Sequence, residues 1–371
     1  MKETSETEIR KSANRIFSQI KLNVEKIQNT NEKYLAPRFM AVLERMKEYL
    51  IITEKEKRPN KATIIYMSDK KAHYGGFCDK LNRIVFLFTA SKQLDCDFKI
   101  YCDTPFNLPQ YLVPNETDWL IDERNIVYDK NKTVAVFSVD FECEIPEISG
   151  IETKITPPSQ QNFIETINGL ADKYEQILCY FHFPVNNVNF QVPYRRLFMP
   201  SQNLQNMIAQ NLEKTGADFV AAHFRFQKLL GDFSDCNLPD FVVLDERQKN
   251  ILIERCLNVL SEISRQNDGF KILVCSDSAS FLKSAKKLDF VFVVSGCENR
   301  IIHTHIDDYR SVGKDAAQKL FTDLFLMSRA KKIYSVVEDK MYAYSSFART
   351  AALINNVEFY KAINGKFERM L

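Results

Sequence analysis

The sequence predicts an α/β protein with two domains, each built on a parallel sheet, after a helical segment at the N-terminus. The 371 residues exceed the usual size of one hydrophobic core, so two domains are the default. From residue 62 onward, short apolar runs alternate with helical patterns, which is typical of doubly wound parallel sheets. An Asn- and Pro-rich stretch at residues 184–200 is the best candidate for the linker between the domains.

Residues 1–58 contain two apolar stripes at helical spacing. The first runs from Ile9 to Ile27 and the second from Phe39 to Leu50. We expect amphipathic helices that pack on the body of the protein or on a second copy, so a homodimer through these helices is a hypothesis. A membrane-surface role is the less favoured alternative, because the polar faces mix Glu with Lys.

Residues 59–200 are predicted to form the first α/β domain. Its strand Ala62–Met67 leads through Gly75 and Gly76 into a helix, which is the opening of a βαβ unit. The two glycines allow the backbone to approach a ligand closely, and a helix N-terminus favours an anion. The pattern GxGxxG is absent, so a dinucleotide site is not indicated. The other predicted elements are strands Phe98–Tyr101, Thr133–Val139 and Ile177–Phe183, and helices Leu81–Leu94 and Gln160–Tyr174.

Residues 201–371 are predicted to form a second, Rossmann-like domain. Strand and helix patterns alternate more regularly here than in the first domain. The predicted strands are Phe219–Phe224, Lys271–Cys275, Phe290–Val294, Lys332–Val336 and Val357–Lys361. The predicted helices are Glu246–Arg265, Ala279–Lys287, Lys314–Ser328 and Ser346–Leu353.

Composition excludes several classes of protein. The 50 basic and 48 acidic side chains nearly balance, so bulk affinity for nucleic acid is not expected. The nine cysteines are dispersed without a CxxC pair, which favours reduced thiols over a disulfide framework. The N-terminus is polar rather than signal-like, and no run approaches the ~20 apolar residues of a membrane helix. We therefore expect a cytoplasmic protein.

The apolar run Phe219–Phe224 ends in a turn that carries Arg225. In an open α/β sheet, ligands bind at the carboxyl ends of the strands, where a guanidinium suits a phosphate or carboxylate. The alternative is a structural Arg225 that pairs with a neighbouring carboxylate. The local pattern leaves both interpretations open.

Two further turns lie at the same level of the predicted sheet. Asp277 and Ser278 follow one strand, and Ser345 and Ser346 open the helix after another. Each serine alone is explained by helix N-capping. Together with Arg225, the turns favour a site for a nucleoside diphosphate, because helix amides and hydroxyls converge there on anions.

Other kinds of chemistry have weaker support. His303, His305, Asp307 and Asp308 could supply metal ligands, but the pattern has no fixed partner, and polar loop residues are the favoured interpretation. A GxSxG nucleophile elbow and a P-loop are both absent from the sequence. We expect no metal and no cofactor.

In order along the chain, these motifs resemble those of the GT-B fucosyltransferases. That group includes core α1,6-fucosyltransferases, the nodulation-factor fucosyltransferase and protein O-fucosyltransferases. His223-Phe-Arg225 is similar to the group's HxRR motif, and Val274-Cys-Ser-Asp277 to its second motif. Asp323-Leu-Phe-Leu-Met-Ser328 with Ser345-Ser-Phe-Ala-Arg349 resembles the third. Gly75-Gly-Phe-Cys-Asp79 resembles the glycine turn of the first domain.

The resemblance implies a GT-B fold, with two Rossmann-like domains facing each other across a cleft and the acceptor on the side of the first. It implies metal-independent, inverting transfer of fucose from GDP-fucose to a glycan or protein. Arg225 would contact the β-phosphate, while His223 and Asp277 would help hold the nucleoside. Ser345 and Ser346 would meet the diphosphate, with Gly75, Gly76 and Ser278 as further donor-binding candidates.

The sequence departs from the group's pattern in two places. Phe226 stands where many members have a second Arg, and Lys228 lies where an acidic residue is usual. Asp232 and Asp79 are therefore both candidates for the general base. Two alternatives stay open: another nucleotide sugar as donor, and a non-catalytic module of the same fold that binds sugar nucleotides.

Overall fold

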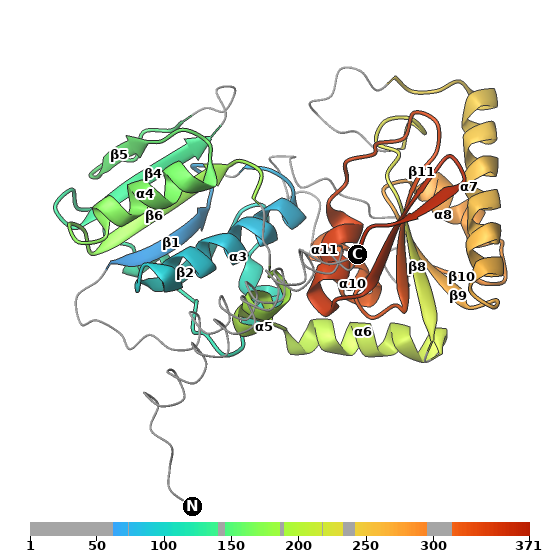
Figure 1. The fold of residues 1–371 in the computed structure, drawn as a ribbon, viewed down its shortest axis with the longest axis horizontal. Coiled ribbons are helices and arrows are strands. Elements are labelled where there is room, and N and C mark those ends of the chain that lie inside the picture. The colour runs from blue at the N-terminus through green and yellow to red at the C-terminus, as the bar shows by residue number, and fades with distance from the viewer. Residues whose placement is uncertain are drawn as a thin grey trace, which may run out of the picture.

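Two sheets organise the part of the chain that the computed structural model describes (Figure 1). The described residues are 62–72, 74–139, 145–185, 189–216, 218–232, 242–294 and 314–371. The predicted N-terminal helices of residues 1–58 lie outside this part of the chain. The same holds for His303, His305, Asp307 and Asp308.

The N-terminal sheet has the strand order β2-β1-β6-β4-β5, and all its neighbouring strands are parallel. Its strands are β1 (Thr63–Ser68), β2 (Asp97–Cys102), β4 (Thr133–Val139), β5 (Glu152–Ile155) and β6 (Gln176–His182). Helices α3 (Phe77–Gln93) and α4 (Gln160–Leu170) pack beside it. Sequence patterns predicted these elements except β5, an edge strand with no buried residue. Helix α3 begins at Phe77, earlier than predicted, because Gly76 serves as its N-cap.

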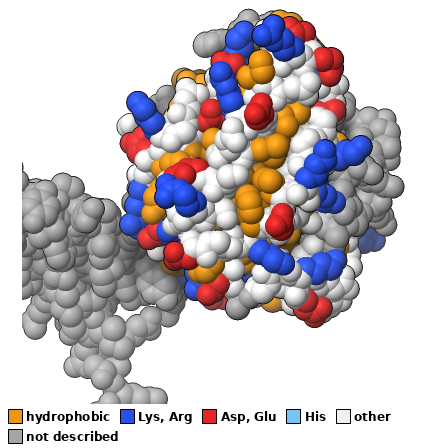
Figure 2. All heavy atoms as spheres, turned by 90° about the vertical axis from the view of Figure 1, so that its right-hand side faces the viewer, with side chains coloured by type: hydrophobic (Ala, Val, Ile, Leu, Met, Phe, Trp, Pro, Cys, Tyr) orange, Lys and Arg blue, Asp and Glu red, His pale blue; other side chains and the backbone are white. Residues whose placement is uncertain are grey.

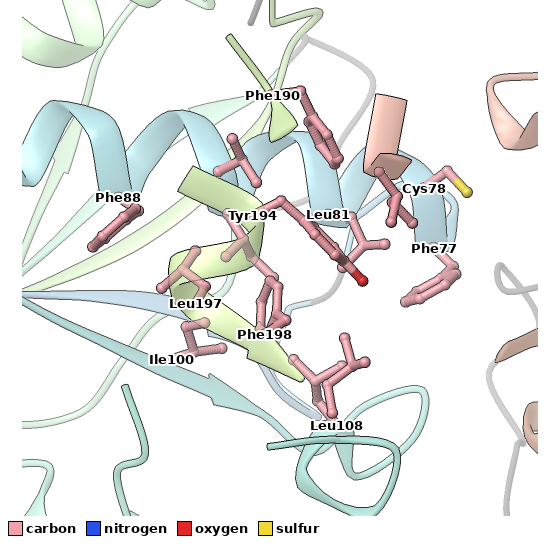
Figure 3. Close-up of a cluster of buried hydrophobic side chains, with 14 of the residues drawn as sticks. Phe77, Cys78, Leu81, Phe88, Ile100, Leu108, Phe190, Tyr194, Leu197 and Phe198 are labelled. Carbon is pink, nitrogen blue, oxygen red and sulfur yellow. The ribbon is translucent and has the colours of Figure 1, made fainter. Parts of the chain in front are cut away.

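The stretch predicted as a linker lies between β6 of the N-terminal sheet and the first strand of the C-terminal sheet, and it contains regular structure that sequence patterns did not predict. It contains helix α5 (Gln191–Leu197) and strand β7 (Phe198–Pro200), which pairs antiparallel with β3 (Leu112–Pro114). Tyr194, Leu197 and Phe198 are buried and lie with Leu81 of α3 and Ile100 of β2 in one hydrophobic cluster (Figure 3). Two short 3-10 helices, Leu108–Gln110 and Glu123–Asn125, complete this half of the chain.

The C-terminal sheet has the strand order β10-β9-β8-β11-β12-β13 and is parallel except for its last strand. Its strands are β8 (Phe219–Phe224), β9 (Lys271–Ser276), β10 (Val291–Phe292), β11 (Lys332–Val337), β12 (Glu358–Ile363) and β13 (Lys366–Arg369). Its helices are α6 (Gln202–Thr215), α7 (Glu246–Gln266), α8 (Ala279–Ala285), α10 (Lys314–Met327) and α11 (Phe347–Asn355). Sequence patterns did not predict α6 or β13.

One hydrophobic core continues from the first sheet into α10. Phe77 of α3 meets Phe321 of α10 edge-to-face, with ring centroids 4.6 Å apart. Tyr111 stacks on the same Phe321 at 4.4 Å. This apolar contact fixes the end of α3 against the helices of the second sheet, which matters because candidate site residues lie on both. In the described part of the chain, no helix is long and apolar enough to cross a membrane.

Candidate functional site

The site residues lie where the order of the C-terminal sheet reverses. From β8 the chain proceeds to β9 and β10 on one side, and β11 and β12 lie on the other. The carboxyl ends of β8 and β11 therefore flank a topological switch point, the usual ligand position in an open α/β sheet. Arg225 directly follows β8, and the turn with Ser345 and Ser346 connects β11 to α11.

Arg225 is oriented by Asp277, which follows the neighbouring strand β9. Arg225 Nη1 lies 3.0 Å from Asp277 Oδ2, and the two side chains are 15% and 6% exposed. Asp277 also accepts hydrogen bonds from the backbone amides of Phe226 and Gln227, each at 2.8 Å. Burial raises the pKa of Asp277, while Arg225 and the amides oppose that rise. The structural ion pair is thus present, and it holds a partly exposed guanidinium at the switch point.

Phe226 points to the opposite side of the sheet from His223. It is fully buried and packs on Phe281 of α8 with ring centroids 4.9 Å apart. Phe226 thus contributes to the core beneath α7 and α8, whereas His223 packs on Phe347 of α11. Phe226 is therefore a core residue in this chain.

His223 is a buried, neutral histidine beside the ion pair. It lies in β8 between Cys275 of β9 and Ser335 of β11. Its ring contacts Phe347 of α11 at 5.4 Å. Burial, followed by the charges of Arg225 and Lys319, lowers the pKa of His223 to about 3. Its Nδ1 atom has no hydrogen-bond partner among the described residues.

Helix α10 brings a buried ion pair, Lys319 with Asp323, to the same side of the sheet. Burial raises the pKa of Asp323, and Lys319 opposes this rise. The thiol of Cys275, a weak donor, also hydrogen-bonds to the Asp323 carboxylate, and Asp323 Oδ1 has no stronger partner within the described part of the chain. Buried polar atoms are usually satisfied, so a water molecule or a ligand between β8 and α10 would complete the hydrogen bonding of His223 Nδ1 and Asp323 Oδ1. Sequence analysis included Asp323 in the third motif without assigning it a role, and it did not single out Lys319; the available signal was a charged pair four residues apart in an apolar helix.

Asp79 of α3 meets Ser346 across the two halves of the molecule. Ser346 Oγ donates a hydrogen bond of 3.0 Å to Asp79 Oδ1. One helical turn further along each helix, Asn82 donates to Thr350 at 3.1 Å. Because Ser346 precedes Phe347, the contact partner of His223, Asp79 is connected to the switch point through the start of α11.

The glycine turn before α3 is shaped around Arg83. Gly75 has φ of +71°, and a Cβ atom there would lie 2.7 Å from Arg83 Nη2. Arg83 in turn donates to the carbonyl of Tyr74 at 2.8 Å. Gly76 is the N-cap of α3 and supplies no side-chain hydrogen bond to the helix. The close approach that Gly75 permits is thus toward a side chain of the protein itself.

Asp232 and Ser278 are engaged in capping α8. Asp232 Oδ2 accepts from Ser278 Oγ at 2.9 Å and from the amide of Ser280 at 2.7 Å. Ser278 Oγ accepts from the amide of Phe281, and Ser278 is fully buried. The capping interpretation therefore accounts for Ser278. Asp232, predicted as one of two candidate bases, has its carboxylate directed at the same helix end.

Among the described residues, His, Cys, Asp and Glu side chains form no group that could hold a metal ion. The sequence candidates for such a group lie outside those residues, so the expected absence of a metal stays a prediction.

No protein-family model and no curated protein matches this chain, but solved structures do. The apo form of POFUT1 superimposes with a TM-score of 0.50 at 10% identity, covering 82% of this chain and 97% of that one. The chain has the GT-B fucosyltransferase fold. Fucosyltransferase NodZ from Bradyrhizobium gives a TM-score of 0.47 at 12% identity, with 85% and 99% coverage. A variant of Arabidopsis thaliana FUT1 in complex with GDP gives 0.46 at 9% identity, with 92% and 78% coverage.

The fold expected from the ordered motifs is therefore confirmed. An identity this low shows shared architecture and not shared activity. The donor, the reaction and the roles of individual residues stay predictions, and they are argued below from the site itself.

Proposed function

We propose that the protein is an inverting, metal-independent glycosyltransferase that transfers fucose from GDP-fucose to a hydroxyl of a glycan or protein. The observation that carries this proposal is Arg225, held by the buried carboxylate of Asp277 at the switch point of the C-terminal sheet. POFUT1, whose fold this chain shares, has also been solved in complex with GDP-fucose.

Arg225 would bind the β-phosphate and stabilise the charge that develops on the departing GDP. A charge-assisted hydrogen bond contributes about 1.5–3 kcal/mol, and more of this is realised as the phosphate oxygen gains charge. Ser345 and Ser346 lie half-buried at the N-terminus of α11, where backbone amides favour the same diphosphate. Asp277 acts in this proposal as the positioning residue of Arg225.

The nucleoside would bind beside α10. A purine offers both ring N–H donors and ring-nitrogen acceptors, so it complements a carboxylate oxygen and an imidazole nitrogen that lack protein partners. His223 Nδ1 is such an atom, and Asp323 Oδ1 has no donor stronger than the thiol of Cys275. The lowered pKa of His223 keeps its ring neutral at physiological pH, so it brings no extra positive charge to the nucleoside.

Asp79 is the better placed of the two candidate bases. In the proposed step the acceptor oxygen forms a bond to the anomeric carbon of fucose, and the bond from that carbon to the β-phosphate oxygen breaks. The acceptor proton passes to the carboxylate of Asp79, and GDP leaves with its charge balanced by Arg225. Asp79 contacts the α11 turn through Ser346, whereas Asp232 caps α8.

A donor screen tests the proposal. Thermal shift and donor hydrolysis would be measured with GDP-fucose, GDP-mannose and UDP- and TDP-sugars. We expect stabilisation and turnover with GDP-fucose, and about 10²-fold or greater loss of turnover in Arg225→Ala, by analogy with the loss of one oxyanion donor. Arg247→Ala, an exposed position on α7, is the matched control. Turnover of only a UDP- or TDP-sugar would overturn the assignment of fucose.

The non-catalytic module is the second candidate, and the burial of Phe226 favours it. With Phe226 in the core, Arg225 is the single arginine of the HxRR-like motif that faces the site. If GDP stabilises the protein while no donor is hydrolysed or transferred to any acceptor, the binding module is the correct function.

A further inference from the structure

A groove on the outer face of the C-terminal sheet is separate from the candidate donor site. It has a volume of about 600 Å³ and lies between α7, the end of β11 and the β12–β13 turn. In Figure 1, α7 lies at the side of the molecule away from the N-terminal sheet. The volume falls within the range of about 300–1,000 Å³ that is usual for ligand pockets.

The groove is held open by a fixed turn. The amide of Gly365 donates to Glu338 Oε1 at 2.9 Å, and the amide of Asp339 donates to Asn364 Oδ1 at 3.0 Å. Asp339 and Asn364 both adopt left-handed backbone conformations, with φ of 52° and 46°. These bonds tie the β12–β13 turn to the end of β11, so the groove exists before any ligand binds.

Glu338 presents a buried carboxylate to this groove. Its side chain is only 6% exposed, and the hydrogen bond from Gly365 occupies one of its two oxygens. The other oxygen has no hydrogen-bond partner within the described residues. This second oxygen is not among the fully enclosed polar atoms that lack a partner, so it is open to the groove, where it can bond to water or to a ligand.

The lining is mostly polar, with Val259 and Phe367 as its apolar side chains. Arg255 and Asn258 of α7 offer N–H donors opposite the carboxylates of Glu338 and Asp339. Phe367 is half-buried and packs edge-on against Tyr334 at 5.9 Å. Figure 2 shows this face of the molecule, where a band of hydrophobic side chains is bordered by charges of both signs.

We propose that the groove binds a saccharide unit. A sugar hydroxyl can donate to Glu338 and accept from Arg255 at once, and the C–H face of a pyranose ring can pack on Phe367. The carboxylates of Glu338, Asp339 and Glu262 outnumber the guanidinium of Arg255, which disfavours phosphates and nucleotides. Arg255 in turn disfavours a compact cation. A neutral, polyhydroxylated ligand satisfies both sets of groups.

The proposal does not depend on the transferase activity, although it fits an enzyme whose acceptor is a glycan. The groove also borders the segment that starts at Glu338 and ends at Ser346. Within this segment the amide of Tyr342 donates to the carbonyl of Arg225 at 3.2 Å. A saccharide bound at Glu338 would thus lie at the far end of the loop that carries the proposed diphosphate contacts.

A glycan array of neutral and acidic oligosaccharides, probed with the full-length protein, tests this inference without any nucleotide sugar. We expect binding to neutral oligosaccharides, no competition by GDP, and affinities about tenfold weaker or worse in Arg255→Ala and Glu338→Gln. Arg247→Ala, on the same helix but outside the groove, should bind as the wild type does. Thermal unfolding of each variant shows whether it is folded; Arg255 is exposed, so its replacement should not affect folding.

Four outcomes would overturn the inference: no array binding, binding that survives both substitutions, competition by GDP, or calorimetric binding of Ca²⁺ alone that Glu338→Gln abolishes. Failure of the donor screen with intact array binding would reject the proposed transferase and leave this site standing. The reverse result would reject the site alone.

Discussion

Replacing Asp277 by Asn would remove the charge that orients Arg225 while leaving the side-chain volume almost unchanged. The carboxylate accepts hydrogen bonds from Arg225 and from two backbone amides. An Asn side chain has one acceptor oxygen, so its NH₂ group would face an N–H donor. Removing one partner of a buried ion pair costs about 3–5 kcal/mol, and the partial exposure of Arg225 places this case near the lower end, about 3 kcal/mol.

Urea unfolding followed by far-UV circular dichroism measures this loss. The single tryptophan, Trp119, is buried in the N-terminal half, so its fluorescence would miss unfolding of the C-terminal sheet. Asp218→Asn is the matched control, because Asp218 pairs with Lys331 at 3.0 Å on the surface, with side chains 49% and 59% exposed. Such an exposed pair contributes about 0–1 kcal/mol.

The same variant should also bind GDP about tenfold more weakly, because Arg225 loses the partner that holds it at the switch point. A stability within about 1 kcal/mol of the wild type, together with unchanged GDP affinity, would refute the positioning role of Asp277. Loss of stability with full GDP affinity would leave Asp277 a purely structural residue.

Two further predictions concern other buried or bridging groups. Asp79→Asn should lower the rate of transfer by about 10²-fold while donor binding is retained. Asp232→Asn should lower the free energy of unfolding by about 1 kcal/mol through the α8 cap and leave turnover nearly intact. Kinetics and urea unfolding of both variants test this, and a loss of turnover in Asp232→Asn alone would make Asp232 the base. Burial lowers the pKa of Lys80 to about 7, so between pH 7 and 10.5 the unfolded chain binds a proton that the folded chain lacks, and stability rises with pH in that window. The free energy of unfolding of the wild type should therefore rise relative to that of Lys80→Met by about 1.4 kcal/mol per pH unit from pH 7 to 9.5. Urea unfolding followed by Trp119 fluorescence measures both. A difference between the two proteins that does not change with pH would contradict the lowered pKa.

The central strands were the most predictable part of the fold. Strands β4 and β8 have the boundaries that the sequence predicts, because strands buried on both faces are continuous apolar runs between polar residues. Edge strands β5 and β13 were missed because they bury no residue and so show no apolar pattern. Helix α5 inside the predicted linker was missed because a proline usually indicates a break, whereas Pro193 lies in the first turn of α5, where a missing N–H costs little.

For the candidate site, the sequence indicated which residues lie at the strand ends but not how they pair. Because Arg225, Asp277 and Ser346 follow predicted strands, the sequence predicted that they lie at the carboxyl edge of the same sheet. Sequence could not show that Arg225 and Asp277 pair, because the contact requires β8 and β9 to be neighbours in the sheet. It also could not show that Asp232 reaches the α8 cap across a 46-residue separation. Capping partners so far apart leave no local signature.

The charge arrangement at the switch point bears on the choice between a catalyst and a binding module. Arg225 and Lys319 are each paired with a buried carboxylate, so the site is not a bare positive patch. Unpaired cations would bind a ground-state diphosphate more tightly. Cations already oriented by buried partners need no reorganisation when charge develops on a leaving group, and such preorganised groups favour the transition state over the ground state. The pairing of Arg225 with Asp277 therefore favours the proposed transferase over the binding module, although the side chain of Phe226 next to it lies in the core.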